Sequence, residues 1–148
     1  MNHLEALFAD LARVFLRSHR LLDRRMTAEG ASLARTKLLL YLEGQEGEAR
    51  AADIAEFFGL APRTVTEALD GLERDGMVRR EPDPQDRRVK RLSITAAGVA
   101  ATVATEPLRV ALVEQIFGVL DAKEQAQLAA ILAKLAVAIG EQEAGKGA

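Results

Sequence analysis

Apolar residues recur at helical spacing along the first part of the chain. Across residues 4–26 they fall three or four positions apart, which predicts one long helix with a wide apolar face. Three shorter helices are predicted after it, because capping and chain-breaking residues bound each apolar segment. These helices span residues 33–42 after Ser32, residues 51–58 before Gly59, and residues 62 to about 75, from Pro62 to Gly76.

The apolar spacing changes at residue 77. Residues 77–80 and 92–94 have the composition and alternation of short strands. Turn-forming residues fill positions 82–86 between them. We therefore expect a β-hairpin over residues 77–95 with a long, exposed tip.

The last third of the chain is again helical in pattern. An alanine-rich segment runs from residue 96 to about residue 119, and Pro107 inside it predicts a kink or a break. Asp121 and Glu124 have capping-box spacing and predict the start of a final helix. We expect residues 141–148 to fray, because they carry little that can be buried. The apolar stripe of the final helix consists of Leu128, Ile131, Leu132, Leu135 and Ile139.

Together these elements predict a mainly α fold with a small β-hairpin, in one domain over residues 1–148. The first helix and the last two helices carry more apolar surface than the small middle portion can cover. Surplus apolar surface of this kind indicates a partner subunit. We expect residues 1–28 and 96–140 to form a helical dimerisation layer, and the protein to be a homodimer.

The composition excludes several classes of function. The chain has no cysteine, which rules out disulfides, thiolate metal sites and thiol redox sensing. It has only two histidines, and Ser18, Ser32 and Ser93 lie outside nucleophile-elbow and glycine-rich phosphate-loop patterns. We therefore expect neither an enzyme nor a metal or cofactor site.

The pattern also argues against a membrane partner. No uninterrupted apolar run approaches the roughly 18 residues typical of a spanning helix. Acidic Glu5 and Asp10 near the start do not fit a signal peptide. The expected location is the cytoplasm. The net charge of −2 does not by itself favour nucleic acid, but the distribution of charge matters more than its total.

Residues 53–72 have the pattern of two short helices that pack at a steep angle around a tight turn. Ala55 is small enough for close approach, Gly59 allows the turn, and Val65 fills the gap between the helices. Ile54, Phe58 and Leu69 complete this small predicted core. The pattern fits a DNA-binding helix-turn-helix and an ordinary helical hairpin equally well.

The predicted hairpin is rich in basic residues. Six arginines and lysines stand against three acidic residues between positions 77 and 95. Arginine on a narrow tip can enter the minor groove of DNA, and basic residues at the hairpin base can meet phosphates. A solvated charged loop is the alternative, but the hairpin directly follows the helix-turn-helix pattern, which favours a nucleic-acid interface.

These residues together resemble the signature of the MarR (multiple antibiotic resistance regulator) family of winged helix-turn-helix transcription regulators. The order of helices on either side fits the family along nearly the whole chain. The resemblance implies that residues 32–95 form a DNA-binding lobe whose hairpin is the wing. It is carried by Pro62, Thr64, Val65, Leu69, Asp70, Leu72, Glu73, Gly76, Met77, Val78, Arg80, Asp83, Pro84, Asp86, Arg87, Arg88, Leu92, Ser93, Ile94, Thr95 and Gly98.

The resemblance also implies residue roles. The helix from Pro62 would lie in the major groove, Asp70 and Arg88 would form an ion pair or contact DNA, and Arg87 would lie near the wing tip. The chain departs from the family at Ala61, where a Ser or Thr cap is usual, and at Glu67. Glu67 would either accept from a cytosine amino group or pair with Arg63 at i,i+4 spacing. The implied DNA-binding residues are Pro62, Arg63, Thr64, Thr66, Glu67, Asp70, Asp86, Arg87 and Arg88.

A repressor released by a small aromatic or amphipathic anion is the function that the resemblance implies, with an inverted-repeat operator in double-stranded DNA. The ligand pocket would lie between the DNA-binding lobe and the helical layer. A protein-binding winged helix without DNA and a constitutive repressor without ligand remain the alternatives. The polar residues expected near that pocket are His19, Arg20, Arg35 and Lys37.

Overall fold

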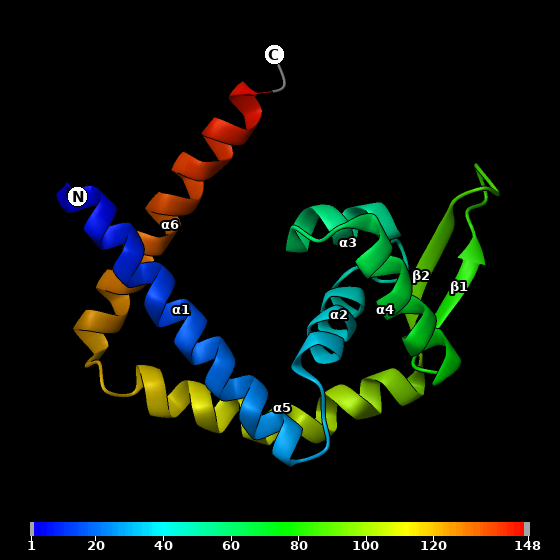
Figure 1. Ribbon diagram of the computed structural model, residues 1–148, viewed down its shortest axis with the longest axis horizontal. Helices are drawn as coiled ribbons and strands as arrows, with labels where there is room; N and C mark the ends of the chain where they lie inside the picture. The colour runs from blue at the N-terminus through cyan, green and yellow to red at the C-terminus, as the bar shows by residue number, and fades with distance from the viewer. Residues whose placement is uncertain (1, 147–148) are drawn as a thin grey trace. The chain divides into compact units, whose positions relative to one another are not determined.

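The computed structural model describes residues 2–146 as helices joined to one antiparallel hairpin (Figure 1). The predicted mainly α fold with a small hairpin is confirmed. The chain divides into two compact units, which meet within the fifth helix between Arg109 and Val110. The elements are α1 (His3–Ala28), α2 (Leu33–Gly44), α3 (Ala51–Phe58), α4 (Pro62–Arg74), β1 (Val78–Pro82), β2 (Lys90–Ile94), α5 (Ala96–Phe117) and α6 (Ala122–Gly145).

Local signals in the sequence set most of the helix ends. The Ser32 side chain accepts a hydrogen bond from the backbone N–H of Arg35 and so caps α2. Gly59 ends α3 with a φ of 64°, a left-handed conformation that costs glycine little. Asp121 and Glu124 form the predicted capping box at the start of α6. These three predictions are confirmed.

The core of the first unit lies where α3 and α4 meet. Ile54, Val65 and Leu69 have no exposed surface, and Ala55 and Phe58 pack partly buried against them. The predicted helix-turn-helix core is therefore confirmed. It is continuous with apolar side chains from α2, the segment before α3, the end of α4 and the hairpin, namely Leu38, Leu39, Leu42, Ala49, Leu72, Val78 and Leu92.

The hairpin pairs β1 with β2 in antiparallel register, from Val78 opposite Ile94 to Pro82 opposite Lys90. The backbone N–H of Leu92 also donates to the carbonyl of Ala49, which joins β2 to the segment before α3. In Figure 1 the hairpin lies beside α4 and its tip projects beyond the helices.

The tip is less exposed than the turn-forming residues predict. β1 continues to Pro82, two residues further than expected, and Asp83 after it is only 1% exposed. The expectation of a wholly exposed tip is therefore wrong at Asp83. The residues from Pro84 to Arg88 are exposed as predicted.

Pro107 does not break the helix that contains it, because α5 is continuous across it. The expected break is therefore wrong, whereas the expected kink stays a prediction. The Arg109 guanidinium donates to the carbonyl of Thr102 and to the hydroxyl of Thr105, so it spans the proline-containing turn. These side-chain contacts connect the residues on the two sides of Pro107.

The expected fraying from residue 141 is also wrong, because α6 continues through Gly145. Alanine, glutamate and glutamine are good helix formers, so the helix extends without a buried face. Residues 147–148 lie outside the described part of the chain.

α5 is long and apolar enough to span a membrane by length and composition alone. The sequence expectation considered only uninterrupted apolar runs. Alanine and valine raise the average hydropathy of this helix although Glu106 and Arg109 lie within it.

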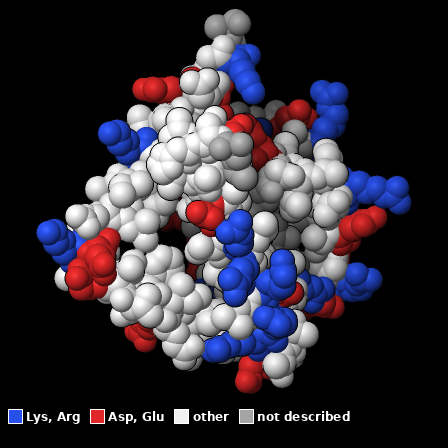
Figure 2. Space-filling view, turned by 60° about the vertical axis from the view of Figure 1, so that its left-hand side comes forward, with Lys and Arg blue, Asp and Glu red and all other residues white. Residues whose placement is uncertain are grey.

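Several helices expose large apolar side chains. In α1 these include Leu4 and Phe8, which are 73% and 75% exposed. Figure 2 shows broad areas of one face with neither acidic nor basic side chains. Such surface is costly in water and indicates a partner. The other exposed apolar residues of α1, α5 and α6 are Leu7, Leu11, Val14, Phe15, Leu16, Val103, Val110, Val113, Phe117, Ile131, Leu132, Leu135, Val137 and Ile139.

Gly98 allows α5 to approach the base of the hairpin, and we expect Gly98→Ala to destabilise the protein. A methyl group there would collide with the backbone carbonyl of Met77 and lie 2.6 Å from Cγ1 of Ile94. We expect a loss of about 1–3 kcal/mol of unfolding free energy, the usual cost of overpacking. Urea denaturation measures it. The matched control is Gly44→Ala, since a methyl group at Gly44 meets no atom within 4 Å; equal midpoints for the two variants would contradict this role of Gly98.

Candidate nucleic-acid interface

The exposed face of α4 carries the residues predicted to meet DNA. Pro62 occupies the first turn, and Ala61 before it makes no side-chain cap, as the sequence predicts. Arg63, Thr64 and Thr66 are all exposed on the same helix. The packing of Val65 into the core therefore leaves these polar side chains facing solvent.

Glu67 pairs with Arg63 rather than standing alone. The Arg63 Nε atom lies 3.2 Å from Oε1 of Glu67, at the i,i+4 spacing that the sequence predicts. Both side chains are mostly exposed, so this pair contributes little to stability. The Thr66 hydroxyl donates to the Pro62 carbonyl on the same helix.

Asp70 pairs with a different arginine from the one expected. Its Oδ1 atom lies 2.7 Å from Nη1 of Arg80, which also reaches Glu73 at 3.3 Å. Arg88 instead contacts Asp86 within the hairpin tip, where Asp86 accepts from both the backbone and the side chain of Arg88. The expected pair of Asp70 and Arg88 is therefore wrong. Arg80 was missed as a partner because β1 brings it to α4 only in the folded chain.

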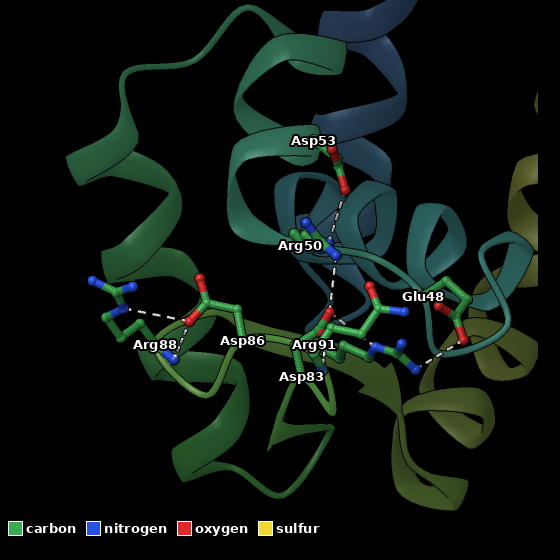
Figure 3. A network of polar contacts seen from close by, with 8 residues as sticks. Glu48, Arg50, Asp53, Asp83, Asp86, Arg88 and Arg91 are labelled. Carbon is green, nitrogen blue, oxygen red and sulfur yellow. Dashed lines mark hydrogen bonds and ion pairs between the residues drawn. The ribbon is translucent and has the colours of Figure 1, made fainter.

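Asp83 is the centre of a network that joins the hairpin to the start of α3 (Figure 3). Its Oδ2 atom accepts from Nη2 of Arg50 at 2.9 Å and from Nε of Arg91 at 3.2 Å. Its Oδ1 atom accepts from the backbone N–H of Gln85 at 2.8 Å. Arg91 also reaches Glu48 at 3.1 Å, in the loop before α3.

These contacts favour the ionised form of Asp83. The backbone hydrogen bond from Gln85 makes the largest contribution, and Arg91 and Arg50 add to it. Burial opposes them by penalising the charge. The net result is that the pKa of the Asp83 carboxyl lies below its ordinary value.

The network was not predicted from the sequence. Asp83 follows Pro82 and precedes Pro84 among turn-forming residues, where an aspartate is normally solvated. Its partner Arg50 is 33 positions away. The available signal was an aspartate enclosed by prolines in a predicted hairpin whose other strand carries an arginine.

The ion pairs leave a particular set of wing cations uncompensated. Arg80, Arg88 and Arg91 each have an acidic partner within 3.5 Å. Among the residues that the structure describes, no acidic side chain pairs with Arg87 or Lys90, and both are exposed. The positive charge available to a ligand at the wing therefore centres on these two residues.

The four residues expected near a ligand pocket are only partly brought together. Nε2 of His19 lies 3.1 Å from Nζ of Lys37, which in turn lies 5.5 Å from the ring centre of Phe58. Arg35 points elsewhere and pairs with Asp75 at 2.6 Å. Arg20 is exposed on α1.

Comparisons with known proteins support the assignment of this fold. A model described as the MarR family matches residues 32–90. The HTH-type transcriptional regulator YwhA of Bacillus subtilis (strain 168) is 30% identical over 92% of this chain and 99% of its own length. The HTH-type transcriptional repressor MdtR of the same strain is 31% identical over 95% of this chain and 85% of its own length. A crystal structure of a mutant MarR from E. coli with operator DNA has a TM-score of 0.76 at 23% identity, and the match covers 90% of this chain and 96% of that one.

Asp83 makes stability depend on pH in a defined direction. Because its folded pKa is lowered, its contribution is complete above the unfolded value of about 4 and disappears as the pH falls through the folded pKa. We expect Asp83→Asn to be less stable than the wild type at pH 7, and the gap to shrink as the pH falls below about 4. Urea denaturation between about pH 3 and pH 7 measures both proteins. A gap that stays constant across this range would show that the charge of Asp83 is not what stabilises the fold.

Proposed function

The chain belongs to the MarR family of transcription regulators, and we propose that it acts as a homodimeric repressor that binds an inverted-repeat operator in duplex DNA. The family resemblance drawn from the sequence motifs is thereby confirmed. We infer that the protein works as a regulator in the cytoplasm rather than as an enzyme. The repressor name of MdtR, a relative 31% identical to this chain, supports the direction of control.

One observation carries the proposal of DNA binding. The uncompensated cations of the wing lie on an exposed hairpin directly beside an exposed helix whose polar residues face solvent. The helix would read base edges in the major groove through Arg63 and Thr64. The wing would contact phosphates or the minor groove through Arg87, where the potential of DNA is most negative. A winged helix that binds only proteins would not need this arrangement of charge.

Selection of bound duplexes from a random pool tests the proposal. We expect an inverted repeat with half-sites about one helical turn, roughly 10 base pairs, apart. Arg63→Ala and Thr64→Ala should change the preferred base at one or two positions, at a cost of about 1–3 kcal/mol each. A uniform loss across all sequences would instead assign these residues to the phosphate backbone.

The same assay separates the roles of the basic residues. Arg87→Ala should lower the slope of log affinity against log salt by about one, because one phosphate contact is lost. Arg13→Ala is the matched control, since Arg13 lies on α1 and is paired with Asp10. Absence of any salt-dependent binding to DNA would favour the protein-binding alternative.

The homodimer is proposed from the apolar surface of the helices. α1 exposes a series of leucine and phenylalanine side chains. Within the second unit, a cavity of about 430 Å³ opens between the end of α5 and the first part of α6, lined largely by apolar groups that include Phe117, Leu128 and Leu132. A second copy would remove these surfaces from water.

Light scattering at low micromolar concentration should give twice the chain mass of 16.0 kDa. Ile131→Lys should shift the protein toward the monomer, because it places a charge in the apolar face of α6. Lys134→Ala, at an exposed polar position of the same helix, should leave the mass unchanged. A wild-type protein that runs as a monomer would contradict the proposal.

We further propose that a small aromatic or amphipathic anion releases the repressor. Support comes from Lys37, whose ammonium lies beside His19 and over the ring of Phe58, a setting suited to an aromatic carboxylate. Titration of aromatic carboxylates and phenols against the operator complex tests this. An anion that binds should lower the affinity of the protein for its operator by some factor. Bound operator should lower the affinity of the protein for the anion by the same factor. Ligands that bind without this effect would favour a constitutive repressor.

A further inference from the structure

Asp83 differs from every other residue of the hairpin tip. It is almost completely buried, whereas residues from Pro84 to Arg88 are exposed. A buried carboxylate is costly unless it is paired and hydrogen-bonded, and here both oxygens are occupied. These contacts indicate that Asp83 has a structural role in the hairpin, and not only the role of a solvated surface charge.

We propose that Asp83 is the positioning residue that holds the wing at a set angle to the helix-turn-helix, and so determines whether the protein can distinguish its operator from other DNA. This inference rests on the proposed function for its DNA-binding part. The geometric part, that Asp83 orients the wing, stands on the contacts alone.

The two carboxylate oxygens connect different parts of the lobe. Oδ1 accepts from the backbone of Gln85 and so shapes the tip itself. Oδ2 accepts from Arg91 on β2 and from Arg50, the residue that caps α3 (Figure 3). The hydrogen bonds of the Asp83 carboxylate thus connect the tip of the hairpin, β2 and the start of α3.

Among the described residues, one backbone hydrogen bond joins the hairpin to the segment before α3. The N–H of Leu92 donates to the carbonyl of Ala49 at 2.8 Å, which holds β2 at one point near its middle. Apolar packing of Val78 and Leu92 and the ion pair of Arg80 with Asp70 also hold the hairpin, but at its base and middle rather than at its tip. The Arg50 contact lies nearer the tip, at the end of β1, and so restricts movement of the tip.

Loss of the Asp83 charge would have an unusual signature in DNA binding. Arg50 and Arg91 would remain in place as cations. Among the described residues, Arg50 would lose the only carboxylate that pairs with its guanidinium. General attraction to phosphates would therefore be retained or strengthened. The preference for the operator over other DNA would fall, because the distance between the wing and α4 would no longer be fixed.

The geometric part is testable without DNA. The chain has no cysteine, so Gln85→Cys on the tip and Glu56→Cys on α3 can be spin-labelled without competing sites. Electron–electron distance measurements, on protein diluted with unlabelled wild type to suppress pairs between subunits, report the spread of wing positions. We expect Asp83→Asn to broaden the distance distribution. We expect Arg50→Gln, whose side chain is about half exposed, to do the same without loss of the fold.

Asp86→Asn is the matched control, because Asp86 is an exposed acid of the same tip whose side chain hydrogen-bonds to Arg88, a residue of the tip itself. It should leave the distribution as narrow as in the wild type. Thermal unfolding confirms that each variant is folded. Unchanged distributions in both Asp83→Asn and Arg50→Gln would overturn the positioning role.

The DNA-binding part compares the selected operator with a mixed-sequence duplex. In Asp83→Asn the preference for the operator should fall by about tenfold, the size of one lost groove contact, while affinity for the mixed duplex is kept. Equal losses on both duplexes, or an unchanged preference with a broadened wing, would overturn the link to specificity. If the selection of bound duplexes yields no operator for the wild type, the proposed function fails. The spin-label distances still decide whether Asp83 orients the wing.

Discussion

The steep packing of α3 against α4 is the constraint on which the rest of the DNA-binding lobe depends. Ile54, Val65 and Leu69 are completely buried at this contact, and Gly59 supplies the left-handed turn that brings the helices together. The base of the hairpin packs on the same core. One small cluster of apolar side chains therefore orients both the exposed face of α4 and the wing.

Polar contacts then decide how much of the lobe's positive charge is available. Most arginines of the hairpin have carboxylate partners, on α4, in the tip or before α3. A count of basic residues therefore overstates the charge presented to a ligand. The protein carries a net charge of −2, yet the pairing concentrates uncompensated cations at Arg87 and Lys90 on the exposed hairpin. Placement rather than composition makes a nucleic-acid interface plausible on an acidic protein.

The sequence predicted best where the controlling interaction is local. Ser32, Gly59 and Asp121 act within one helical turn, and each ends or starts a helix at the predicted place. The pair of Arg63 and Glu67 is also local, since four helical residues bring side chains to the same face. The break expected at Pro107 does not occur, although proline cannot donate the backbone hydrogen bond of its helical turn.

By itself, the sequence determined the order of elements, their caps, the apolar core of the helix-turn-helix and the family signature, because these follow from spacing along the chain. Only the tertiary structure decided which charges meet. Asp70 selects Arg80 rather than Arg88, and Asp83 is buried against Arg50, 33 positions away. Long charged side chains can reach many partners at similar cost, so their pairing depends on where the packed backbone brings them. That choice is made in space, and no pattern along the chain encodes it.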